Sequence, residues 1–325
     1  MDGSLGEYEQ MKRIMITGAL GQIGSELTVK LRDLYGRDNV LATDVRTNDS
    51  EAATEGPFEI LDVMDAKGMM EAATKHHADT IIHMAALLSA TAEANPVFAW
   101  NLNMDGLMNA LETAKELDAQ FFTPSSIGAF GPTTPKDETP QDTIQRPTTM
   151  YGVNKVAGEL LADYYFHRFG VDTRGLRFPG LISYVTPPGG GTTDYAVEIF
   201  YEAIKHGHYT SYIDKGTYMD MMYMPDALNA IIDLMEADPS NLRHRNSFNV
   251  TAMSFDPEEI AEAIRKEIPE FTLSYAVDPV RQQIASSWPN SIDASAAKKE
   301  WGFTTKYDLQ TMTKDMVSKL SLKTF

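Results

Sequence analysis

Two tyrosine–lysine pairs have a spacing that supports acid–base chemistry. "YGVNK" spans residues 151–155 and "YEAIK" spans residues 201–205. Residues four apart share one face of a helix, so each lysine can lie beside the phenol of its tyrosine. A neighbouring ammonium favours the phenolate and lowers the pKa of the phenol. Either tyrosine would then be a candidate general base toward a substrate hydroxyl.

Position in the chain selects the first pair. Tyr151 follows Ser126 by 25 residues, and "AQFFTPSS" places that serine at the end of a predicted strand. Ser125 lies one position earlier. Tyr201 has no strand-end serine at that distance, and we predict that it is a packed helix residue.

A glycine-rich stretch, "RIMITGALGQIGSEL" at residues 13–27, carries the second chemical signal. Its hydrophobic run predicts a strand, and its three glycines suit a tight turn, close approach to a pyrophosphate, and close packing of helix on strand. The stretch therefore predicts a dinucleotide phosphate site. The residues of this site are Gly18, Gly21, Gln22, Ile23 and Gly24.

Asp44 ends the second predicted strand, 20 residues after Gly24. A carboxylate at this point accepts hydrogen bonds from ribose hydroxyls and repels a 2′-phosphate, which favours NAD over NADP. Arg46 argues the other way, because an arginine can hold that phosphate. Further residues at or after strand ends are expected to line the same cleft. They are Val45, Asp62, Val63, Met84, Ala85 and Ala86.

Strands and helices alternate through the first half of the chain. Strands are expected at 13–17, 39–44, 58–63, 80–86, 119–126 and 173–179, with helices at 22–35, at 100–117 and from residue 151. This order predicts an α/β fold with a Rossmann-like, doubly wound parallel sheet. We expect a disordered lead at 1–11, an NAD-binding domain at 12–180, and a smaller α/β substrate lobe at 181–325, parts of which can return to the first sheet.

Composition excludes several classes of function. The net charge of −18 would repel a phosphate backbone, so nucleic acid is not an expected partner. The chain has no cysteine and no H-E-x-x-H motif, and we expect no metal site. We expect no membrane span, because the sequence has no run of 18 apolar residues.

Taken together, T-G-x-x-G-x-x-G, a strand-end serine and Y-x-x-x-K resemble the extended short-chain dehydrogenases/reductases. The resemblance implies that Asn103 supports an active-site water and the lysine, and that Pro179 lies beside the nicotinamide. The catalytic set it implies is Ser126 (or Ser125), Tyr151, Lys155 and Asn103, of which Tyr151, Lys155 and Asn103 also face the cofactor.

Three further segments resemble the short-chain type of L-threonine 3-dehydrogenase over residues 11–306. They are "SSIGAFGPTTP", "PGGGTTDYAV" and "RQQIASSWPNSIDASAAKKEWGF". The resemblance implies oxidation of the threonine β-hydroxyl to 2-amino-3-oxobutanoate with NAD. The glycine loop at 189–191 is a candidate hinge for a closure that excludes water. Trp288 is expected to cover the substrate or to be a core aromatic. The candidate substrate contacts are Ser89, Ser126, Tyr151, Gly180, Thr192, Thr193 and Trp288.

Two alternatives remain open. A sugar-nucleotide epimerase or dehydratase commonly carries a Y-G-P turn after the sixth strand, and this chain has "RFPGLISYV" there. A non-catalytic NAD-binding regulator would not need the serine, tyrosine and lysine. The resemblance also implies a homodimer through the helices at 100–117 and after residue 151, and a functional link to a CoA-dependent 2-amino-3-oxobutanoate lyase. It implies a mitochondrial location in eukaryotes and a cytoplasmic one in bacteria.

Overall fold

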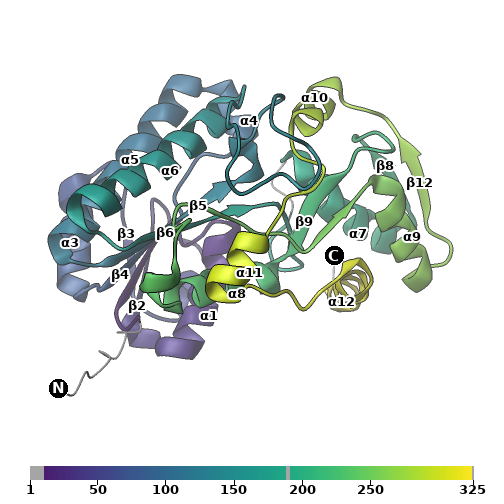
Figure 1. Ribbon diagram of the computed structural model, residues 1–325. Coiled ribbons are helices and arrows are strands. Elements are labelled where there is room, and N and C mark those ends of the chain that lie inside the picture. Colours follow the sequence, from purple (N-terminus) through teal and green to yellow (C-terminus); the bar gives the residue numbers. More distant parts are fainter. Residues whose placement is uncertain (1–10, 188–190, 324–325) are drawn as a thin grey trace, which may run out of the picture.

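The computed structural model describes residues 11–187 and 191–323 (Figure 1). Its main sheet has seven parallel strands in the order β10-β6-β5-β4-β1-β2-β3. The sheet confirms the predicted fold class. Its strands are β1 (Ile14–Thr17), β2 (Val40–Asp44), β3 (Phe58–Ile60), β4 (Thr80–His83), β5 (Gln120–Ser126), β6 (Thr173–Phe178) and β10 (Phe248–Asn249).

Helices cover both faces of this sheet (Figure 1). We call the sheet and these helices the sheet region. Alternate residues of β1 show why both faces are covered. Ile14 and Ile16 pack with Leu27 on one face, while Met15 packs with Leu111 on the other. One face carries α3 (Ala66–His76), α5 (Pro96–Leu117) and α6 (Met150–Phe169), and the other carries α1 (Gln22–Tyr35), α8 (Met224–Glu236) and α11 (Ser295–Trp301). Short elements are η1 (Arg37–Asn39), α2 (Glu51–Thr54), α4 (Ser89–Ala94), η2 (Ile127–Ala129) and η4 (Pro239–Asn241).

A second hydrophobic core defines the C-terminal lobe. The lobe holds a three-stranded sheet in the order β11-β9-β7 and a parallel pair, β12-β8. Its elements are β7 (Gly180–Ile182), η3 (Thr192–Asp194), α7 (Tyr195–His206), β8 (His208–Ser211), β9 (Met219–Tyr223), β11 (Met253–Phe255), α9 (Pro257–Glu267), β12 (Thr272–Tyr275), α10 (Pro279–Ser287) and α12 (Leu309–Ser321). The helices α8 and α11 and the strand β10 follow residue 181 in sequence but pack in the sheet region.

Several boundaries differ from the predicted ones. The helix expected from Trp100 begins at Pro96, because proline fits the first turn without losing a helix hydrogen bond. The third and fourth strands end early, at Ile60 and His83, so the residues expected at their ends lie in the turns that follow. Met11, expected in the disordered lead, is buried in the core of the sheet region.

Within the two described ranges, no helix is long and apolar enough to cross a membrane. Over the same ranges, no three histidine or carboxylate side chains gather as a group that could hold a metal ion.

Candidate active site

The glycine turn between β1 and α1 is built for close approach. Gly18 has φ +65°, and a Cβ atom on it would lie 2.6 Å from the backbone nitrogen of Ala85. A Cβ on Gly24 would lie 2.3 Å from the Gly18 carbonyl oxygen, so the helix packs directly on the turn. Gly21 is the N-cap of α1 and leaves this helix without a side-chain cap. The exposed N-terminus of α1, with no acidic residue in its first turn, suits an anion such as a pyrophosphate.

Asp44 lies beside this turn, at the end of β2. Its Oδ2 accepts a hydrogen bond from the backbone nitrogen of Leu20 at 3.0 Å, which holds the carboxylate at the mouth of the turn. Val45 and Arg46 follow it and are exposed. These positions agree with an adenosine ribose binding beyond the end of β2.

The residues after β3 divide into one that faces solvent and one that does not. Asp62 is exposed, and its Oδ1 accepts from the backbone nitrogen of Met64 at 2.9 Å. Val63 is buried in the core, where it contacts Gly106 of α5. The predicted cofactor contact of Val63 can therefore come from its backbone but not from its side chain. After β4, Met84, Ala85 and Ala86 are partly exposed.

Tyr151, Lys155 and Ser126 meet where β5 ends and α6 begins. Thr149 caps α6 by accepting from the backbone nitrogen of Gly152 at 3.1 Å, which places Tyr151 in the first turn. The Lys155 Nζ lies over the Tyr151 ring, 5.3 Å from its centroid, and donates to the Pro124 carbonyl oxygen at 2.6 Å. The structure thus brings together the three residues whose spacing predicted acid–base chemistry.

Burial dominates the ionisation of this group. It raises the pKa of Tyr151 to about 12, against the lowering effect of a hydrogen bond with Ser126. It lowers the pKa of Lys155 to about 8, against the attraction of Glu159. The expectation that the pKa of Tyr151 lies below its ordinary value is therefore wrong, because burial of the phenol outweighs the hydrogen bond with Ser126.

The two rival serines have different partners. Ser126 partners Tyr151, and its Oγ also accepts from the backbone nitrogen of Gly128 at 3.1 Å. Ser125 is buried, and its Oγ donates to Glu159 Oε1 at 2.5 Å. Successive side chains of a strand point to opposite faces, which separates the two hydroxyls. The geometry favours Ser126 as the hydroxyl that meets a substrate.

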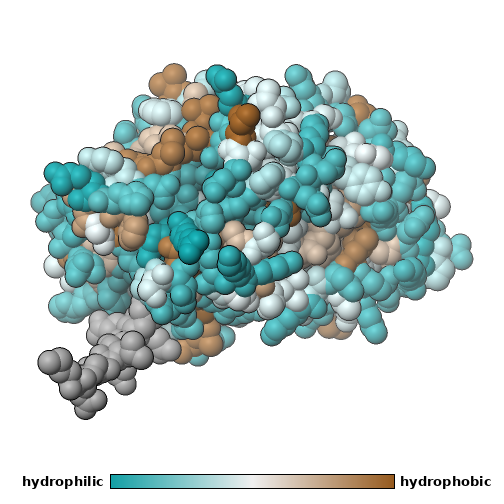
Figure 2. Space-filling model, viewed as in Figure 1, coloured by the Kyte–Doolittle hydropathy of each residue, from teal (hydrophilic) through white to brown (hydrophobic). Residues whose placement is uncertain are grey.

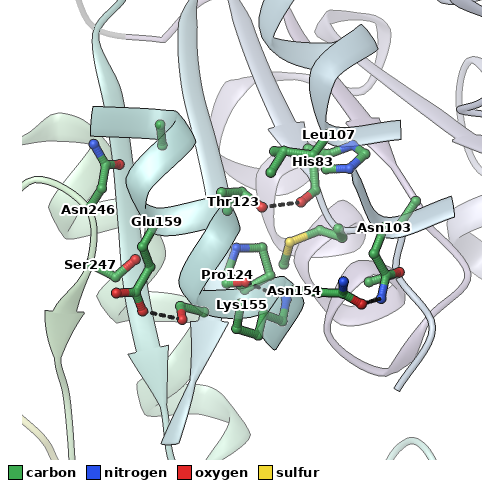
Figure 3. A pocket seen from close by; sticks show the side chains of 16 residues that line it. His83, Asn103, Leu107, Thr123, Pro124, Asn154, Lys155, Glu159, Asn246 and Ser247 are labelled. Carbon is green, nitrogen blue, oxygen red and sulfur yellow. Dashed lines mark hydrogen bonds between the residues drawn. The ribbon is translucent and has the colours of Figure 1, made fainter. Parts of the chain in front are cut away.

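Asn103 ties three segments together. Its side chain accepts from the backbone nitrogen of Leu87 at 2.8 Å, donates to the Leu87 carbonyl oxygen at 3.2 Å, and donates to Asn154 Oδ1 at 3.0 Å. Figure 3 shows Asn103 and Asn154 pointing toward one another, in a pocket that Lys155 and Glu159 also line. Asn154 and Glu159 escaped the sequence reasoning. Their spacing from Tyr151, three and eight residues further along the chain, is the sequence signal that could have identified them.

His83 lines the same pocket from β4. Its Nδ1 lies 2.9 Å from Thr17 Oγ1, and burial together with the nearby Lys155 lowers its pKa to about 3. The imidazole is therefore neutral at physiological pH and adds no charge beside Lys155.

The candidate substrate contacts come from both regions. A Cβ on Gly180 would lie 2.9 Å from the Thr193 Cβ, so these two are in contact, whereas Thr192 is buried. Trp288 is buried in the core of the C-terminal lobe at the end of α10, which packs against η3. Ser89 begins α4 in the sheet region. Pro179 is buried between β6 and β7.

The glycine loop at 189–191 and Tyr201 are the remaining predicted features. Of the proposed hinge, Gly189 and Gly190 lie outside the described residues, while the backbone oxygen of Gly191 accepts from Tyr212 Oη at 3.2 Å. Tyr201 lies on α7, partly buried against the lobe core, as predicted.

Comparison with known proteins identifies the family. Residues 14–251 match the NAD dependent epimerase/dehydratase family. This chain belongs to that family. The result confirms the resemblance to extended short-chain dehydrogenases/reductases, and it makes the chain an enzyme of an NAD-dependent family.

Individual relatives agree over almost the whole chain. An uncharacterized epimerase/dehydratase of Staphylococcus aureus (strain USA300) is 66% identical, with 96% of this chain and 98% of the relative covered. The structure of L-threonine dehydrogenase from Clostridium difficile is 66% identical with a TM-score of 0.95, covering 96% of this chain and 98% of that one. The holo form of a GalE-like L-threonine dehydrogenase from Cupriavidus necator is 47% identical with a TM-score of 0.92, covering 95% and 99%. All three come from bacteria, so the mitochondrial location expected for eukaryotic members gains no support.

Proposed function

We propose that this enzyme oxidises the β-hydroxyl of L-threonine to 2-amino-3-oxobutanoate with NAD as the acceptor. The observation that carries the proposal is the 66% identity, over nearly the whole chain, with an L-threonine dehydrogenase of known structure. The meeting of Ser126, Tyr151 and Lys155 at one strand end supplies the chemistry that such an oxidation requires.

The site residues fit NAD. The uncapped N-terminus of α1 would hold the pyrophosphate, and the Asp44 carboxylate beside the turn would accept hydrogen bonds from the ribose. When bound, NAD supplies the acceptor for the hydride that leaves the threonine Cβ. We assign the remaining steps to the side chains of this chain.

Ser126 orients the substrate oxygen and Tyr151 takes its proton. The pKa of Tyr151 near 12 disfavours the phenolate, so an opposing positive charge is needed. The Lys155 ammonium, 5.3 Å from the ring centroid, is the cation in place to provide it. Asn103 holds the loop after β4 against α6 and so keeps the floor of the site rigid.

For the amino acid itself, we propose contacts from both the sheet region and the C-terminal lobe. Thr193 and Gly180 would bind from the C-terminal lobe and Ser89 from the sheet region, with Trp288 as the apolar cover. Thr192 is a weaker candidate because it is buried. A small polar pocket suits a substrate that carries an ammonium and a carboxylate within a few atoms.

The test is to follow NADH absorbance with L-threonine and NAD, with L-serine and NADP in parallel. We expect turnover to be fastest with L-threonine and NAD. Binding of NAD without turnover of any alcohol would instead support a non-catalytic regulator. An epimerase or dehydratase of sugar nucleotides is the second candidate, favoured by the name of the S. aureus relative, and a UDP-sugar assay separates it.

We also propose a homodimer built on α5 and α6. These two helices pack together and expose a row of large apolar side chains, and Figure 2 shows hydrophobic residues gathered over this part of the surface. The exposed residues are Phe98, Trp100, Met108, Val153, Leu160 and Tyr164. Light scattering of the wild type and of Leu160→Glu tests the proposal, which predicts a dimer and a monomer, respectively.

The product suggests one further partner. A 2-amino-3-oxo acid is a substrate for a CoA-dependent lyase, and we propose a functional link to such a lyase rather than a stable complex. Coupled turnover with a purified lyase would show whether the product is passed on.

A further inference from the structure

Glu159 is a buried carboxylate that the proposed chemistry does not use. It lies on α6 four residues after Lys155 and is 5% exposed. Both oxygens are engaged: Oε1 accepts from Ser125 Oγ at 2.5 Å and from Arg177 Nε at 3.0 Å, while Oε2 accepts from an Arg177 terminal nitrogen and from Gln145 Nε2, each at 2.8 Å. A two-point ion pair of this kind fixes the orientation of the carboxylate.

Arg177 extends this ion pair across the sheet. One terminal nitrogen donates to the Gln141 carbonyl oxygen at 2.7 Å and to Asn249 Oδ1 at 3.1 Å. The guanidinium also lies over the Phe130 ring, 5.2 Å from its centroid. The pair therefore connects α6 with β5, β6, β10 and the segment that follows β5.

The bond to Ser125 has consequences for both of its neighbours. Pro124 presents the carbonyl oxygen that accepts from Lys155, and Ser126 carries the hydroxyl beside Tyr151. A carboxylate that holds Ser125 therefore holds the strand end from which both of these groups face the lysine and the tyrosine. Figure 3 shows Glu159, Pro124 and Lys155 around one pocket.

We propose that Glu159, anchored by Arg177, is a positioning residue for the reaction. Through Ser125 it fixes the end of β5 against α6, and its charge keeps the buried Lys155 protonated. The expected effect on kcat rests on the proposed function. The position and the charge of Lys155 do not depend on any substrate.

The charges around Lys155 decide the sign of the effect. Glu159 faces it from α6, and His83 faces it from β4 as a neutral imidazole because burial lowers the His83 pKa to about 3. Tyr151 is protonated, since its pKa is about 12, and Asn103 on α5 carries no charge. Removing the negative charge of Glu159 should therefore lower the pKa of Lys155 below about 8, and the alkaline limb of the kcat profile should move to lower pH.

The experiment compares three variants of the full-length protein. Glu159→Gln removes the charge, Ser125→Ala removes the link to β5 and keeps the charge, and Asp163→Asn is the matched control. Asp163 lies one turn further along α6, half-buried, and accepts from Asn246 Nδ2 at 3.1 Å. Each variant is assayed for kcat against pH, for NAD binding, and for the titration of Lys155 by ¹³C NMR of labelled lysine, assigned with Lys155→Arg.

For Glu159→Gln we expect kcat to fall about tenfold or more, with unchanged NAD affinity and a Lys155 titration at lower pH. Ser125→Ala should lower kcat and leave the Lys155 titration where it is. Asp163→Asn should change neither. A Glu159→Gln protein with wild-type kcat and wild-type Lys155 titration would overturn the proposal.

The two proposals fail in different ways. If the wild type does not oxidise threonine, the proposed function fails, but a shifted Lys155 titration in Glu159→Gln still supports the role of the charge. If Glu159→Gln does not fold, Ser125→Ala decides, because it leaves the ion pair intact. A wild-type kcat in a folded Ser125→Ala protein would rule out the link through β5.

Discussion

Three candidate site residues of the sheet region lie where parallel strands end, whereas two candidates of the C-terminal lobe lie on segments that tertiary packing brings together. Gly18, Asp44 and Ser126 each sit at the carboxyl end of a parallel strand or directly after it. Thr193 and Trp288 are 95 residues apart in the chain, and they lie on η3 and at the end of α10, two elements that pack against one another. The strand-end positions follow from local backbone geometry, whereas the proposed substrate contacts in the lobe depend on tertiary packing.

This contrast predicts that the chemistry depends on the sheet region and that substrate affinity depends on the lobe. Tyr151→Phe should have the largest effect on turnover. Loss of the hydroxyl removes the general base, and kcat should fall by about 10²- to 10⁴-fold. Stopped-flow measurement of NADH formation gives kcat, and fluorescence titration should show NAD binding close to that of the wild type. Turnover near the wild-type rate would remove Tyr151 from the mechanism.

Gly18→Ala tests whether the turn depends on backbone geometry. The substitution forces an alanine to φ +65° and places its Cβ 2.6 Å from the Ala85 nitrogen. The free energy of unfolding should fall by about 2 kcal/mol or more, measured by urea denaturation. Gly170→Ala is the control, since Gly170 has φ +77° but nothing within 4 Å of its Cβ position. Equal losses in the two variants would show that crowding at Gly18 is unimportant.

Much of the sheet region could be predicted from the sequence, because its strand ends and turns depend on local backbone geometry. Apolar runs and glycine spacing act over a few neighbours, and α1 has the predicted bounds, 22–35. Strand ends were less accurate: β3 stops at Ile60, so the buried Val63 could not be recognised as a core residue from its place in the run.

Longer-range features could not be predicted. Nothing in the sequence near Ser125 reveals that Glu159, 34 residues later, accepts a hydrogen bond from the Ser125 hydroxyl. The return of β10 to β6 likewise depends on pairing between segments about 70 residues apart. Burial also reversed one prediction, since it outweighs the hydrogen bond with Ser126 and raises the pKa of Tyr151 to about 12.

Asp44→Asn tests the choice between NAD and NADP. Loss of the charge weakens hydrogen bonds to the ribose and relieves repulsion of a 2′-phosphate. NAD affinity should fall about 10- to 100-fold, since a hydrogen bond to a charged group contributes about 1.5–3 kcal/mol. Affinity for NADP should change less or improve. Titration with both nucleotides measures the ratio, and an unchanged ratio would leave Arg46 as the stronger determinant.

Trp288→Phe moves the test to the lobe. The smaller ring would leave part of the substrate uncovered, and we expect KM for threonine to rise about tenfold, in line with about 1.4 kcal/mol for lost aromatic contact. KM for NAD should not change. A lower melting temperature with normal KM would instead identify Trp288 as a core aromatic, a role with which its burial is also consistent.

Thr193→Val has the smallest expected effect and distinguishes Thr193 from its neighbour Thr192. Thr193 is partly exposed and touches Gly180, while Thr192 is buried. A neutral hydrogen bond contributes about 0.5–1.5 kcal/mol, so Thr193→Val should raise KM for threonine about 2- to 12-fold with little change in kcat. Thr192→Val, which changes the same group one residue away, should leave KM unaltered. If the two variants exchanged these results, the substrate would bind on the other face of η3, and the packing of Thr193 against Gly180 would be structural.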